Sequence, residues 1–121
     1  MESIQSKSID QPDVRREFDK GYVELLSLGD VTFSRATFQP GWRWSECVKP
    51  LVKTDSCQVH HTTYVVSGHL HIEHGDGAVL DAVPGTLCII APGHDAWVVG
   101  DEPVVAVDFD EAGRDYAKPV D

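Results

Sequence analysis

The strongest constraint on the fold is a series of short segments of high β-propensity that begins at residue 22. Nine such segments, rich in Val, Ile, Thr, Phe and Trp, occupy residues 22–28, 31–38, 42–48, 57–66, 69–74, 78–83, 86–90, 96–99 and 104–109. Turn dipeptides such as Pro40-Gly41, Ser67-Gly68 and Pro84-Gly85 separate them. No stretch longer than about ten residues here repeats apolar residues at helical spacing. The pattern therefore predicts an all-β sandwich or barrel, the jelly roll included.

Alternation within the segments predicts which side chains face inward. In residues 69–74, Leu70 and Ile72 share one face of a strand, while His69, His71 and Glu73 share the other. We expect the apolar pair to lie in the core and these two histidines to face solvent.

Composition narrows the class of protein. The chain has 121 residues and a net charge of −10. Residues 1–72 carry 9 acidic and 8 basic residues, whereas residues 73–121 carry 11 and 2, so the second part alone contributes −9. Such a charge argues against nonspecific binding to nucleic acid or anionic membranes. No apolar stretch approaches the roughly 20 residues of a membrane span. The acidic part is either a solvated face or a docking surface.

The first 20 residues are polar and show no helical stripe, so we predict an N-terminal arm over residues 1–20 and one domain over residues 21–121. A domain of this length can fold without disulfides. The three cysteines, Cys47, Cys57 and Cys88, form no CxxC pair. With no export-type signal at the N-terminus, we expect a reducing, cytoplasmic location.

The stretch from residue 59 to residue 97 resembles the two-motif layout of a small single-domain cupin. Residues 64–68, YVVSG, match the end of the first motif, G-x5-H-x-H-x3,4-E-x6-G. Pro84-Gly85, the apolar segment 86–90 and Pro92-Gly93 match the second motif, G-x5-P-x-G-x2-H-x3-N. The phrases GWRWSE, TDSCQ and PGHDAWVVGDEP resemble a bacterial branch of cupin-domain proteins of unsettled activity. The resemblance implies a cupin-type double-stranded β-helix, a jelly-roll barrel.

The same resemblance shows that the family's usual metal ligands are missing. If Gly68 is the final glycine of the first motif, the glutamate position falls at His61 and the His-x-His pair at Asp55 and Cys57. The second-motif histidine falls at Ala96. A standard site of three histidines and one glutamate is therefore absent.

The residues present form a different candidate metal site. In this register, Asp55, Cys57 and His61 alternate onto one strand face, and His94 has the same parity as Ala96. A thiolate with one or two imidazoles suits Zn(II) or Fe(II) and leaves a position for a small molecule. Asp55 is the weakest candidate, because it precedes the predicted strand. Each residue also has a structural interpretation: Cys57 as a buried apolar side chain, and the histidines as hydrogen-bonded interior groups.

An organic ligand pocket without metal is the alternative. Trp42, Trp44 and Glu46 would share one face of a strand, so Trp44, Glu46 and His61 could stack on and anchor a polar ring. Core packing would explain the tryptophans equally well. Trp97 is expected on the outer face or in a dimer contact.

Three functions remain open at this point: a metal-dependent enzyme acting on a small polar molecule, a non-catalytic binding protein, and an interaction module that presents its acidic part. We expect a homodimer under all three. No nucleophile with a base at a recognisable spacing, and no phosphate-binding glycine loop, indicates a further class.

Overall fold

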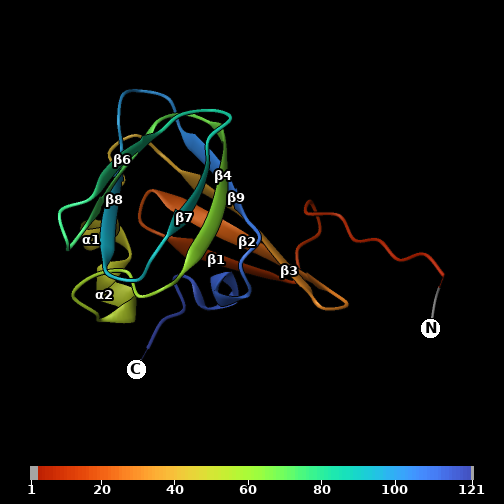
Figure 1. Cartoon of the computed structure of the whole chain (residues 1–121). Coiled ribbons are helices and arrows are strands. Elements are labelled where there is room, and N and C mark those ends of the chain that lie inside the picture. The colour runs from red at the N-terminus through yellow and green to blue at the C-terminus, as the bar shows by residue number, and fades with distance from the viewer. Residues whose placement is uncertain (1–2, 121) are drawn as a thin grey trace.

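Eight of the nine predicted segments form strands in the computed structural model, which describes residues 3–120 (Figure 1). Within that range the strands are β1 (Val14–Phe18), β2 (Gly21–Leu28), β3 (Val31–Phe38), β4 (His61–Ser67), β5 (Leu70–His74), β6 (Val79–Ala82), β7 (Leu87–Ile90), β8 (His94–Val98) and β9 (Val104–Asp108). They form a six-stranded sheet in the order β1-β2-β3-β9-β4-β7 and a three-stranded sheet in the order β6-β5-β8. All pairings are antiparallel. The predicted all-β class is confirmed.

The one predicted segment that does not form a strand is residues 42–48. It is largely helical, so the strand predicted there is wrong. Residues 44–47 form α1 (Trp44–Cys47), and α2 (Lys49–Val52) follows directly. The physical reason is the spacing of the apolar residues Trp44, Cys47, Val48 and Leu51, which fits one face of a helix as well as a strand interior. Trp44 and Cys47 are buried on that face.

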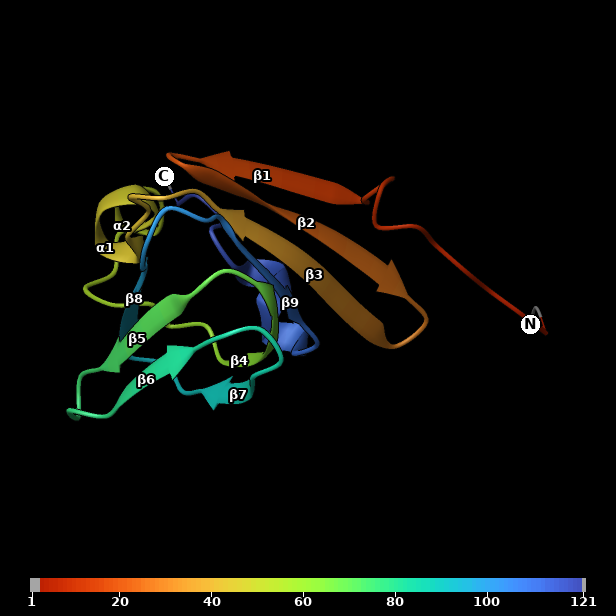
Figure 2. The same cartoon turned by 90° about the horizontal axis from the view of Figure 1, so that it is seen from above.

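Part of the stretch predicted as an arm is a strand. β1 pairs with β2 from Val14 opposite Leu25 to Phe18 opposite Gly21 and forms the edge of the larger sheet. The residues before β1 run away from the body of the molecule in both views (Figures 1 and 2). The division into an arm and a domain stays a prediction, as do the homodimer and the cytoplasmic location.

The core lies between the two sheets. Val65 and Val104 of the larger sheet pack with Leu70 and Ile72 of the smaller one. The inward orientation predicted for these two β5 residues is thus confirmed. Between the described strands no hydrogen-bonded ladder joins the two sheets, so the predicted jelly-roll barrel is an open pair of sheets rather than a closed barrel. Within residues 3–120, no helix is long and apolar enough to cross a membrane.

Candidate metal centre

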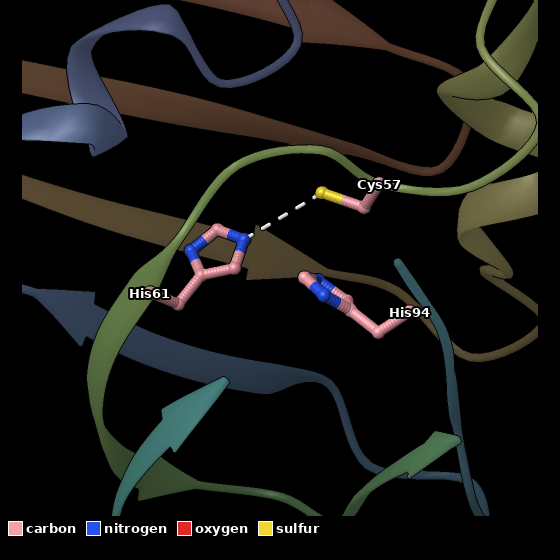
Figure 3. Close-up of side chains that lie close together, drawn as sticks. All are labelled: Cys57, His61 and His94. Carbon is pink, nitrogen blue, oxygen red and sulfur yellow. Dashed lines mark hydrogen bonds between the residues drawn. The ribbon is translucent and has the colours of Figure 1, made fainter. Parts of the chain in front are cut away.

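Three side chains from separate stretches of the chain converge between the sheets. Cys57 lies in the loop before β4, His61 begins β4 and His94 begins β8. Their ligand atoms all lie within 4.8 Å of one another. Figure 3 shows the three side chains pointing toward one another. Within residues 3–120, this is the one group of three or more His, Cys, Asp or Glu residues that could hold a metal ion by this spacing.

Backbone hydrogen bonds bring the loop before β4 against the turn before β8. The Cys57 amide donates to the His94 carbonyl at 2.8 Å, and the Gly93 amide donates to the Cys57 carbonyl at 2.7 Å. Gly93 has a φ of +105°, and a Cβ there would lie 3.2 Å from His74 Nε2. A glycine is therefore strongly favoured at this turn, which places His94 opposite Cys57.

The spacing of the three side chains suits a tetrahedral ion. Cys57 Sγ lies 3.7 Å from His61 Nε2. Two such ligands on a tetrahedral Zn(II) ion would be about 3.6 Å apart, given the usual bond lengths. His94 Nδ1 donates to the Ala91 carbonyl at 2.8 Å, which leaves Nε2 of this ring for a ligand bond.

Asp108, at the end of β9, is a site residue that the sequence did not reveal. His61 Nδ1 donates to its Oδ2 at 2.6 Å. The carboxylate is itself held by the Asp110 amide at 2.7 Å and by the Thr63 hydroxyl at 3.3 Å. The hydrogen bond from His61 to Asp108 fixes the His61 ring so that its Nε2 faces Cys57. Asp108 is 47 residues away in sequence, and the only signal for it is one acid at the end of an otherwise apolar strand.

The surroundings shift the pKa of Cys57 and the pKa of His61. Burial alone would raise the pKa of the Cys57 thiol, but hydrogen bonds and charge from His61 and His94 outweigh it and lower this pKa to about 6. Burial alone would lower the pKa of His61, yet the contacts with Asp108 and Cys57 raise it to about 9. Without metal, the group is therefore arranged to hold a thiolate beside an imidazolium.

A cavity of about 60 Å³ adjoins the group between the sheets. His61, His94 and Asp108 line it together with mostly apolar side chains, among them Trp44 and Tyr116. Tyr116 was also missed from the sequence. It follows a short 3₁₀ helix (Glu111–Asp115), and its buried ring lies 5.4 Å from the His61 ring. Burial, with added negative charge from Cys57, Cys47 and Asp108, raises the pKa of Tyr116.

The structure separates the remaining candidates from this group. Asp55 is exposed and lies outside it, because the residues around it form a loop in which strand alternation does not apply. Glu46 is exposed on α1 and does not line the cavity, whereas Trp44 and His61 do. Trp42 and Trp44 both line the cavity, but Glu46, two residues farther along the helix, does not share their face, which the pocket hypothesis required.

Solved structures share this fold at low sequence identity. A protein of unknown function from Rhizobium leguminosarum matches with a TM-score of 0.62 at 17% identity, covering 89% of this chain and 97% of that one. A cupin-2 domain protein from Rhodospirillum rubrum matches at 0.56 and 19%, covering 87% and 65%. A conserved protein with a double-stranded β-helix domain from Klebsiella pneumoniae matches at 0.58 and 22%, covering 88% of each chain. No protein-family model matches the sequence, and no curated protein does. The comparisons show the cupin fold.

Proposed function

We propose that this cupin-fold protein holds a divalent Zn or Fe ion at Cys57, His61 and His94 and binds a small molecule there. The observation that carries the proposal is the convergence of one sulfur and two imidazole nitrogens within 4.8 Å at a largely buried place. Three protein ligands are typical of sites that keep a further position for a substrate.

The donor set fits such an ion. A thiolate and two imidazoles favour Zn(II) or Fe(II) over hard cations. When bound, the ion would act as a Lewis acid toward an oxygen or sulfur donor of the small molecule. In the motif register that takes Gly68 as the final glycine, Cys57 and His61 fall at the positions of a cupin histidine and glutamate, so the proposed ligands would replace the usual ones in the same region.

The residues around the three proposed ligands orient the two histidine rings and shield the site. Asp108 keeps the proton of His61 on Nδ1, and the Ala91 carbonyl does the same for His94. Nε2 of His94 would then be available to bind, Nε2 of His61 would bind once the ion displaces its proton, and the Cys57 thiolate would supply the negative charge. The apolar walls of the adjoining cavity limit the water that reaches the site.

Metal-free binding of a small molecule in this cavity is the second candidate. The observation in its favour is that Trp44 and His61 both line the cavity, whose volume of about 60 Å³ would admit only a very small molecule. It requires no ion, so metal content separates it from the first candidate.

Elemental analysis of protein purified without chelator or affinity metal tests the proposal. We expect close to one Zn or Fe per chain, removable by a strong chelator. A folded protein that contains no metal, and that takes up neither ion when each is added in excess, would contradict the metal proposal and favour the second candidate.

A further inference from the structure

A second, larger depression is lined by Cys57, which does not line the interior cavity. Its volume is about 370 Å³, within the size range of small-molecule sites. We call it the C-terminal groove, and its walls include Cys57, Trp44, Tyr116, Val52, Val59 and Val120. The groove therefore borders one of the three proposed ligands, which is itself only 2% exposed.

The interior cavity and the C-terminal groove meet at two aromatic side chains. Trp44 and Tyr116 line both spaces, while His61 and His94 line the cavity and Cys57 lines the groove. The proposed metal centre therefore lies between the two. The cavity, at about 60 Å³, has room for only a few waters. An organic molecule that binds the ion must place its bulk in the groove.

The outer wall of the groove is held in place. The Val120 amide donates to the Leu51 carbonyl of α2 at 2.9 Å. Arg16 Nη1 donates to the carbonyls of Arg114 and Tyr116, both at 2.8 Å. The C-terminal segment accordingly runs beside α2 in both views (Figures 1 and 2). A wall fixed at both ends forms a defined groove before any ligand arrives.

The chemistry of the groove favours an uncharged, apolar occupant. Its two charged residues, Asp115 and Lys118, have opposite signs. Two of its polar side chains are engaged: the Thr54 hydroxyl donates to the Ser56 carbonyl at 2.7 Å, and Gln58 Nε2 donates to the Ser56 hydroxyl at 2.9 Å. Most of the other lining side chains are apolar, so a sugar-like molecule would bury hydroxyls against them without partners, which is unfavourable.

We propose that the C-terminal groove binds the apolar body of a small organic ligand, a ring or branched chain without net charge, whose single polar head reaches the ion past Trp44 and Tyr116. The inference rests on the proposed function and deepens it by naming the class of ligand. It places the ligand's bulk on the Cys57 side of the centre and not between the sheets.

Two neutral metal-binding probes test this class in the Co(II)-loaded protein. Benzohydroxamic acid and acetohydroxamic acid have the same head, but only the first has an apolar ring. We expect benzohydroxamic acid to bind on the order of tenfold more tightly, because its ring is buried in the groove. The visible absorption spectrum of the bound Co(II) changes when either probe binds, so it measures the affinity of each.

A substitution in the groove locates the ring. Val120→Asp should weaken the binding of benzohydroxamic acid by about tenfold, because it adds a charge only where the ring lies. The affinity for acetohydroxamic acid and the Co(II) content should stay unchanged. Val79→Asp, at an exposed position of β6, is the matched control and should change neither. Equal binding of the two probes, or no effect of Val120→Asp, would overturn the groove proposal alone. Failure of the chain to bind Co(II) would overturn the proposed function, and the groove proposal with it.

Discussion

One histidine–aspartate pair lies between the two sheets and another lies on the smaller sheet with its aspartate in solvent, so the two differ in burial and in neighbours. The inner pair, His61 and Asp108, is joined at 2.6 Å, and both side chains are less than one-sixth exposed, at 13% and 11%. The outer pair, His71 and Asp81, is joined at 2.8 Å across β5 and β6, with Asp81 55% exposed. Their hydrogen-bond chemistry is the same, and only their surroundings distinguish them.

The surroundings decide what each pair can do. The inner pair directs a ring nitrogen toward a thiol and a second imidazole. The second nitrogen of His71 meets Glu73 at 3.4 Å, and its ring lies 4.6 Å from that of Trp97. Among residues 3–120, three ligand atoms come close enough for an ion at the inner pair and not at the outer one. A histidine–carboxylate pair thus indicates a metal site only when buried soft ligands converge on it.

The largest expected effect is the loss of metal on removal of an inner ligand. Cys57→Ser should lower Zn(II) affinity by more than about 100-fold, since changes beyond the direct ligands already cost 10–100-fold. Competition with a chromophoric chelator measures this. The outer double variant His69→Ala with His71→Ala is the control and should bind Zn(II) like the parent. If the outer variant lost metal while Cys57→Ser still bound it, the metal site would lie at the outer pair and not at the inner one.

A smaller effect is expected from the carboxylate behind His61. Asp108→Asn should lower Zn(II) affinity by about 10–100-fold, because the amide no longer holds the ring as a charged acceptor. The equivalent change in the outer pair, Asp81→Asn, should leave the affinity unchanged. The chelator competition measures both, and circular dichroism confirms that each variant folds. An unchanged affinity in Asp108→Asn would show that the inner carboxylate has no part in the site.

The next effect concerns the turn that places His94. Gly93→Ala should lower the free energy of unfolding by about 1–3 kcal/mol, because the residue has a φ of +105° and the added Cβ meets His74. It should also weaken Zn(II) binding. Gly77→Ala is the control in the β5–β6 turn: its φ is +97°, but a Cβ there meets nothing within 4 Å. Urea unfolding should show strain in both variants, and only Gly93→Ala should affect metal. If Gly93→Ala and Gly77→Ala bound Zn(II) equally tightly, the conformation of the turn at Gly93 would have no influence on the metal site.

The sequence predicted those parts of the fold that depend on local pattern. Strand alternation and glycine turns are local, so β2 to β9 and the inward face of β5 could be found. The helical segment was missed because Trp44, Cys47 and Val48 suit either structure. Only the packing of Trp44 and Cys47 into the core decides between them.

The candidate site divides in the same way. Cys57, His61 and His94 could be proposed because motif spacing and alternation bring them near one another. Asp108 could not, because its contact with His61 depends on the register in which β9 pairs with β4, where Asp108 faces Thr63. Long-range register of this kind is set by the whole sheet and not by a segment.

The smallest expected effect is a pH dependence of stability at the outer pair. A hydrogen bond from His71 to Asp81 raises the pKa of His71; burial opposes this rise, and a hydrogen bond to Glu73 makes a smaller upward contribution. A histidine whose pKa is higher in the folded state stabilises it fully below the unfolded pKa of about 6.5, and the contribution is lost as pH rises through the folded pKa. Asp81→Asn should therefore lower the free energy of unfolding more at about pH 5.5 than at about pH 9. NMR titration of the His71 ring should show a lower pKa in this variant, and urea unfolding at the two pH values measures the difference. A loss of stability independent of pH, with the His71 pKa unmoved, would mean that the outer pair is not coupled in solution.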